Sequence, residues 1–91
     1  MTRVVVYTTG DACMQCKLTK QVMDAVGLAF ESIDITEPAH ARDRDHVTRD
    51  LGYASAPVVE IDGCEHWSGF EPERIRALAA RFQLSSGIEE R

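Results

Sequence analysis

The chain has 91 residues, enough for one small domain, and its 44% of hydrophobic residues indicates a packed core rather than disorder. The formal net charge of −5 argues against nucleic acid or an anionic membrane as a partner, because both require a basic face. No apolar run approaches the roughly 20 residues that span a bilayer, and no charged-then-apolar leader opens the chain, so we expect a soluble, cytoplasmic protein.

The first predicted elements are a buried strand and an amphipathic helix. Residues 3–7 (RVVVY) form a continuous β-branched run, which is typical of a buried, central, parallel strand. A loop with Gly10 and Asp11 follows. The next apolar side chains recur at i, i+4, i+7 and i+8, as on one face of a helix: Leu18, Val22, Ala25 and Val26. Gly27 then ends this helix.

A second strand and a second helix are expected next. In residues 29–35 (AFESIDI) isoleucines alternate with polar residues, as in a strand with one buried face. Thr36 is expected to cap a helix that runs to about Leu51, and Gly52 ends it. The apolar face of this helix is thin: Ala39, Val47 and Leu51.

The last third of the chain predicts a β-hairpin and a final helix. Residues 56–61 (APVVEI) form a third strand, the Asp62-Gly63 pair is a strong hairpin signal, and residues 64–67 (CEHW) form the returning strand. The final helix has Pro72 near its start and an apolar inward face: Ile75, Leu78, Ala79 and Phe82.

The order of these elements is βαβαββα. Strand–helix–strand units with right-handed crossovers make a parallel core, and the closing hairpin adds an antiparallel edge. The sequence therefore predicts an α/β fold in which a four-stranded mixed sheet is flanked by three helices. We expect a single domain over residues 1–82 and a short C-terminal tail, residues 83–91, that frays.

Cys13 and Cys16 lie where the first helix begins, with two residues between them. A helix N-terminus offers unpaired N–H groups and the positive end of the helix dipole, and both favour a thiolate at Cys13. Cys16 is one turn further along and more covered. An exposed thiolate can attack a substrate disulfide, and the second thiol can then resolve the mixed disulfide. We therefore favour a catalytic pair whose redox group is the Cys13–Cys16 disulfide, with no bound cofactor or metal.

Other uses of this pair stay open. Cys64 and His66 would complete a four-ligand zinc site, but a strand of roughly 13–16 Å separates the two ends of the sheet. A structural Cys13–Cys16 disulfide would close a trivial loop. Cys64 itself is interpreted as a small strand or core residue, with a regulatory thiol as the alternative.

Two further segments are predicted to lie beside the cysteines. A cis Ala56–Pro57 bond would bring the Ala56 backbone alongside the disulfide, where an extended substrate segment can pair with it. Trp67 and Phe70 could form an apolar floor under the cysteine loop. The simpler interpretations are a proline that starts a strand and a tryptophan that packs in the core, and for Trp67 composition alone favours the core.

The segments YTTGDACMQCKLTK, GYASAPVVEIDG and HWSGFEPERIRAL together resemble the NrdH-redoxins, glutaredoxin-like electron donors to the class Ib ribonucleotide reductase. The resemblance covers about residues 3–80 and implies the thioredoxin/glutaredoxin fold. It implies Cys13 as nucleophile, Cys16 as resolving thiol and Pro57 as the cis-proline. The residues expected to contact a substrate or partner are Met14, Gln15, Ala56, Pro57, Trp67, Ser68, Gly69 and Phe70.

The resemblance also implies partners. Thioredoxin reductase, fed by NADPH, would be the electron donor, and the class Ib ribonucleotide reductase or other disulfide clients would be the acceptor of a monomeric carrier. Glutathione-dependent glutaredoxins typically carry Thr-Val-Pro and Gly-Gly where this chain has Ser55-Ala56-Pro57 and Trp67–Phe70, and the tryptophan is expected to obstruct glutathione.

Four features depart from the family pattern and bear on the choice of partner: a longer loop before Cys13, Ser55, Glu71 and the extra Cys64. The alternative functions are a glutathione-dependent glutaredoxin and a non-enzymatic, redox-sensing or zinc-binding regulator. The first would turn over with glutathione, whereas the second would bind a partner in a stable oxidised or metallated state.

Overall fold

The computed structural model describes residues 3–10, 12–63 and 65–89, with the side chains of residues 82–89 left out. Its elements follow in chain order: β1 (Val4–Thr8), α1 (Met14–Ala25), β2 (Glu31–Asp34), η1 (Pro38–His40), α2 (Ala41–Asp45), η2 (His46–Asp50), β3 (Val58–Ile61), β4 (Glu65–Ser68) and α3 (Pro72–Glu89). This order confirms the predicted βαβαββα arrangement. In the described part of the chain, no helix is long and apolar enough to cross a membrane.

The four strands form one mixed sheet in the order β2-β1-β3-β4. β1 runs parallel to β2 and antiparallel to β3, and β4 runs antiparallel to β3, so β1 is central as predicted. The register pairs Tyr7 with Val58 and Val4 with Ile61. The end of β1 that leads to the cysteines therefore lies beside the start of β3, and the hairpin turn lies at the opposite end of the sheet.

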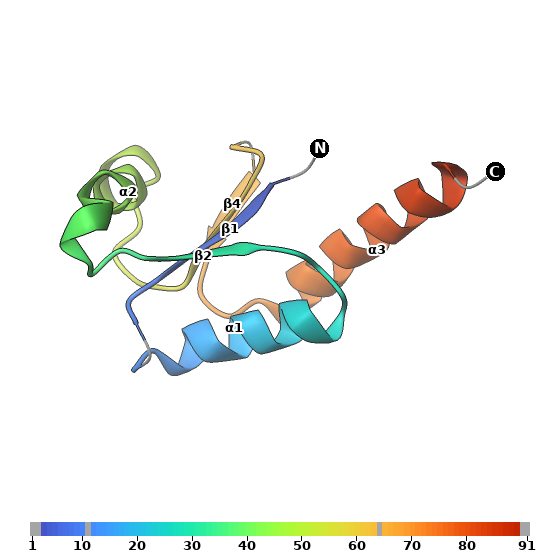
Figure 1. Ribbon diagram of the computed structural model, residues 1–91, viewed down its shortest axis with the longest axis horizontal. Helices are drawn as coiled ribbons and strands as arrows, with labels where there is room; N and C mark the ends of the chain where they lie inside the picture. The colour runs from blue at the N-terminus through green and yellow to red at the C-terminus, as the bar shows by residue number, and fades with distance from the viewer. Residues whose placement is uncertain (1–2, 11, 64, 90–91) are drawn as a thin grey trace.

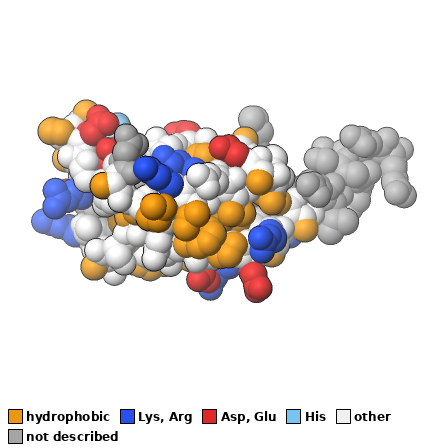
Figure 2. Space-filling model, turned by 90° about the horizontal axis from the view of Figure 1, so that it is seen from below, with side chains coloured by type: hydrophobic (Ala, Val, Ile, Leu, Met, Phe, Trp, Pro, Cys, Tyr) orange, Lys and Arg blue, Asp and Glu red, His pale blue; other side chains and the backbone are white. Residues whose placement is uncertain are grey.

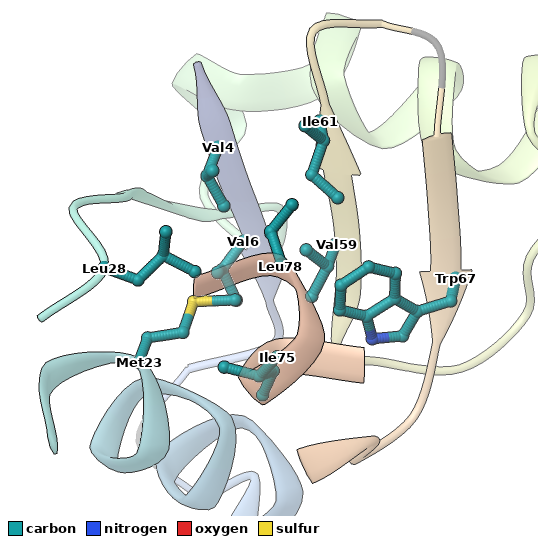
Figure 3. Packing of buried hydrophobic residues seen from close by; sticks show 9 residues of the cluster. All are labelled: Val4, Val6, Met23, Leu28, Val59, Ile61, Trp67, Ile75 and Leu78. Atoms are coloured by element: carbon teal, nitrogen blue, oxygen red, sulfur yellow. The ribbon is translucent and has the colours of Figure 1, made fainter. Parts of the chain in front are cut away.

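Helices cover both faces of the sheet. Figure 1 shows α1 and α3 on one side and α2 on the other. The larger core cluster joins the first side to the sheet, and its buried members are Val4, Val6, Met23, Leu28, Val59, Ile61, Trp67, Ile75 and Leu78 (Figure 3). The smaller cluster lies on the opposite face of the sheet and contains Val5, Tyr7, Val58 and, from η2, Val47. Alternate residues of β1 thus belong to opposite cores, as the pleat of a strand requires.

The buried face of α1 differs from the prediction, because it is formed by Cys16, Thr19 and Met23. Of the predicted residues, Val22 and Val26 pack at the edge of the larger core, Leu18 is half-buried and Ala25 is exposed. Thr19 can be buried because its hydroxyl donates a hydrogen bond to the carbonyl of Gln15 at 2.8 Å. Seen from the α1 side, hydrophobic side chains gather in the middle of the surface (Figure 2).

The predicted second helix is a composite of a 3-10 turn, a short α-helix and a π-helical turn. Thr36 does not cap it. Instead the backbone N–H and the hydroxyl of Thr36 both donate to Oδ1 of Asp34, at 2.8 and 2.5 Å, which makes a turn directly after β2. Of the predicted apolar face, Val47 is buried and Leu51 packs against the smaller core, whereas Ala39 is exposed.

The final helix buries Ile75, Leu78 and Ala79 as predicted, while the side chain of Phe82 lies outside the described residues. The backbone of α3 continues as a helix to Glu89. The division into a domain of residues 1–82 and a frayed tail stays a prediction.

Candidate active site

Cys13 and Cys16 are joined by a disulfide, with their Cα atoms 5.2 Å apart. Cys13 is the N-cap residue of α1, and its Sγ accepts a hydrogen bond from the backbone N–H of Cys16 at 3.2 Å. Cys13 is half-buried, whereas Cys16 is only 1% exposed. An attacking group therefore reaches the Cys13 sulfur first. Negative charge that develops on this sulfur faces the first N–H groups of the helix.

The loop before Cys13 is held by Gly10. Its carbonyl accepts a hydrogen bond from the backbone N–H of Cys13 at 3.2 Å. Its φ of +96° is a conformation that side chains rarely adopt, and a Cβ at this position would lie 3.4 Å from Oδ2 of Asp34. Hydrogen bonds from Thr36 hold the pKa of Asp34 below its usual value, so a carboxylate borders the loop. Asp11 lies outside the described residues.

The segment around Pro57 is tied to the end of β4. The Ala56–Pro57 peptide bond is cis, as predicted. The carbonyl of Pro57 accepts a hydrogen bond from the N–H of Gly69 at 2.8 Å, and the hydroxyl of Ser68 donates to the carbonyl of Ser55 at 2.9 Å. These two bonds fix the loop before β3 against the turn after β4.

The turn after β4 reaches the cysteine motif. A Cβ on Gly69 would lie 3.9 Å from Oε1 of Gln15, and Gly69 is bonded to Pro57. The fold therefore gathers the motif, the proline segment and this turn at one end of the sheet, as the sequence predicts. Phe70 beside them is half-buried. Met14 is 66% exposed, and among the described side chains it is the one large hydrophobic residue classed as exposed.

Trp67 lies in the core rather than on the site's surface. It is 7% exposed and packs beside Val59 in the larger cluster (Figure 3), which confirms the core interpretation. Its ring is buried and does not project into the site, and the expectation that Trp67 obstructs glutathione stays a prediction. The Arg74 guanidinium lies 5.7 Å from the ring centroid, and Glu71 pairs with Arg74 Nε at 3.5 Å. Glu71, the residue directly before α3, thus pairs with an arginine in the first turn of that helix.

A polar cluster between the sheet and η2 was not predicted from the sequence. The Tyr7 hydroxyl donates to Oε1 of the buried Glu60 at 3.0 Å, and Nε2 of His46 lies 3.0 Å from both oxygens of that carboxylate. Nδ1 of His46 lies 3.1 Å from Asp50. Hydrogen bonds to Asp50 and Glu60 raise the pKa of His46, and burial with the Glu60 bond raises the pKa of Tyr7. The one hint of this cluster in the sequence is Glu60, a charged residue within the otherwise apolar strand β3.

The zinc alternative gains no support. Among the described residues, no group of three or more His, Cys, Asp or Glu side chains could hold a metal ion. Cys64 lies outside the described residues. The N–H of Asp62, in the hairpin turn, donates to the carbonyl of Arg3, so this turn lies at the end of β1 remote from Cys13.

Comparisons with known proteins agree on the family. The sequence model described as glutaredoxin matches residues 4–67. The glutaredoxin-like protein NrdH of Escherichia coli K12 is 38% identical over 76 residues, which cover 84% of this chain and 88% of that protein. The NrdH protein of Lactococcus lactis subsp. lactis (strain IL1403) is 33% identical over 76 residues, covering 84% and 99%.

The solved structure of NrdH-redoxin from Escherichia coli superposes with a TM-score of 0.68 at 37% identity, and the match covers 84% of this chain and 93% of that one. That protein is described as glutaredoxin-like with a thioredoxin-like activity profile. The thioredoxin-like protein BC3987 matches with a TM-score of 0.70 at 33% identity, covering 84% of this chain and 99% of that one.

Proposed function

The chain belongs to the glutaredoxin family, and within it to the NrdH-type glutaredoxin-like proteins. From this premise we propose that it carries electrons from NADPH, through thioredoxin reductase, to the disulfide of a class Ib ribonucleotide reductase. It is a thiol–disulfide oxidoreductase with a Cys-x-x-Cys pair. The observation that carries the proposed roles of the pair is the unequal exposure of the two cysteines at the start of α1. Such a carrier works as a monomer in the reducing cytoplasm, with no bound cofactor.

The proposed reaction transfers two electrons through one mixed disulfide. The Cys13 thiolate attacks one sulfur of the client disulfide, and the other client sulfur leaves as a thiolate. Cys16 then loses its proton and attacks the Cys13 sulfur, which forms the Cys13–Cys16 disulfide and releases the reduced client. The reductase returns two electrons to this disulfide. The burial of Cys16 supports this order, because a client sulfur reaches Cys13 first.

The proposed client groove runs between the cysteine motif and the two tied segments. The carbonyls of Ser55 and Pro57 each accept a hydrogen bond, from Ser68 and Gly69 respectively. Ala56 lies between them, and its backbone would pair with an extended client segment. Met14 and Gln15 would contact the client from the helix, and Ser68, Gly69 and Phe70 from the turn. Trp67 would act from below, by packing β4 in place.

The donor is proposed to be a protein reductase rather than glutathione. Glutathione requires polar groups beside the cysteines to hold its carboxylates. Here the Gly69 N–H and the Ser68 hydroxyl already bond to the Pro57 segment, so they are not offered to a tripeptide. This engagement of donors, and not a projecting Trp67 ring, supports weak binding of glutathione. The thioredoxin-like activity profile named for the Escherichia coli relative points the same way.

Two single variants test the roles of the cysteines. Cys16→Ser should accumulate a mixed disulfide with a protein client, because Cys13 attacks but is not resolved. Cys13→Ser should form none and should abolish turnover. The adducts are identified by intact mass, with loss of the adduct on adding dithiothreitol as the control. Turnover that survives in Cys13→Ser would overturn the assignment of Cys13 as the nucleophile.

A further inference from the structure

The helix that carries the cysteines also carries two methionines in opposite environments. Met14 is the first residue of α1, lies between Cys13 and Cys16, and is 66% exposed. Met23 is 0% exposed, and its sulfur packs among the core side chains shown in Figure 3. The same thioether is thus presented to solvent at the site and withheld from solvent two and a half turns later. This pair provides its own matched control for reagents that attack sulfur.

We propose that Met14 is a modification site, oxidised to its sulfoxide by peroxide-class oxidants while the protein is in the disulfide form, and that this weakens the binding of protein partners. The Met14 sulfur attacks one oxygen of hydrogen peroxide, a new S–O bond forms as the O–O bond breaks, and water is released after proton transfer. The sulfur loses two electrons and the peroxide gains them.

The disulfide state determines which sulfur reacts. In the reduced protein, a Cys13 thiolate is a better nucleophile than a thioether and would consume the oxidant first. In the structure described here, the sulfurs of Cys13 and Cys16 are bonded to each other, and Cys16 is also buried. Met14 is then the accessible two-electron donor within the motif. Oxidation of Met14 therefore follows when oxidised protein accumulates faster than the reductase returns electrons to it.

The proposed consequence rests on the proposed function, because it assumes that partners dock over the motif. Met14 offers a flexible, apolar side chain beside the reacting sulfur, a type of surface that adapts to several partners. The sulfoxide is polar and chiral, so a partner would bury a polar oxygen where it had buried a thioether. Methionine sulfoxide reductases can reverse the change.

The first experiment maps the oxidation. The disulfide form of the Cys64→Ser protein, which lacks the third thiol, is treated with hydrogen peroxide and digested, and each methionine-containing peptide is weighed. The proposal predicts the addition of one oxygen at Met14 well before Met23. Equal rates at the two methionines, or faster oxidation of Met23, would overturn it. This readout needs no partner and is independent of the proposed function.

The second experiment measures docking. Insulin reduction driven by dithiothreitol reports on binding of a protein disulfide whatever the natural electron donor is. Peroxide treatment should raise KM for insulin roughly tenfold, a change equal to about 1.4 kcal/mol, with a smaller effect on kcat. Met14→Leu should show the same KM before and after treatment, because it keeps an apolar side chain without a sulfur. Met14→Gln should have a raised KM without peroxide.

The outcomes separate the two proposals. A KM that does not change when Met14 is fully oxidised would overturn the docking effect, and so would an equal peroxide response in Met14→Leu. Failure of thioredoxin reductase to reduce the untreated protein would instead count against the proposed electron donor, because the insulin assay does not use that enzyme.

Discussion

Gly69 links the turn after β4 to the cysteine motif. Its replacement by alanine should reduce activity by more than the accompanying loss of stability explains. The φ of Gly69 is +92°, so a side chain costs roughly 1–2 kcal/mol in backbone strain. The new Cβ would lie 3.9 Å from Oε1 of Gln15, which is ordinary contact and adds no clash. Its methyl group would, however, occupy the proposed client groove.

Gly63→Ala is the matched control. Gly63 has a φ of +73° in the hairpin turn at the far end of the sheet, and nothing lies within 4 Å of its added Cβ. The two variants should therefore lose a similar free energy of unfolding, about 1–2 kcal/mol each, in urea titrations of the disulfide form. Only Gly69→Ala should lower kcat/KM for insulin, by roughly fivefold or more, equal to about 1 kcal/mol. Equal activity of the two variants, at equal stability, would refute the placement of Gly69 in the groove.

Three further predictions concern the packing and the polar cluster that hold the site. The pKa of His46 is raised in the folded protein, so its contribution to stability is complete below the unfolded-state pKa of 6.5 and is lost as pH rises through the higher folded-state pKa. Urea midpoints measured from pH 6 to 9 should therefore fall as pH rises. The fall should be smaller in His46→Gln. Tyr7→Phe and Glu60→Leu should each destabilise the protein by about 1–3 kcal/mol. The double variant should lose less than the sum of the two losses, because leucine at position 60 leaves no carboxylate for the tyrosine hydroxyl to bond. Additive losses would contradict a direct hydrogen bond between the two side chains. Met23→Ala should cost about 2–5 kcal/mol in the same titration, because it empties a fully buried site in the larger core; a loss below about 1 kcal/mol would contradict that packing.

The sequence predicted the site best where the chain's order dictates geometry. Cys13 had to lie at the start of α1, because a buried strand and a short loop precede it. Pro57 had to lie at the same end of the sheet, because β3 begins there. These inferences depend on topology, which a few strong patterns determine. The resemblance in the three motifs then narrowed the chemistry from any Cys-x-x-Cys protein to one family.

The sequence failed where polar side chains make specific contacts. Thr19 was left out of the buried face because hydrophobic periodicity does not count a threonine, although a bond to its own helix lets it enter the core. Thr36 was expected to cap a helix, but its N–H and hydroxyl both donate to Asp34 in a turn, and the 3-10 helix begins only at Pro38. For Trp67, by contrast, composition favoured the core, and the cluster that it shares with Ile75 and Leu78 of α3 confirms that interpretation.

The most direct test of the proposed function compares two electron donors. NADPH consumption is followed with thioredoxin reductase, this protein and insulin, beside a parallel reaction with glutathione and glutathione reductase. We predict turnover with thioredoxin reductase, abolished in Cys13→Ser, and little turnover with glutathione. Turnover with glutathione alone would contradict the proposal, and would mean that the groups bonded around Pro57 can still accept the tripeptide.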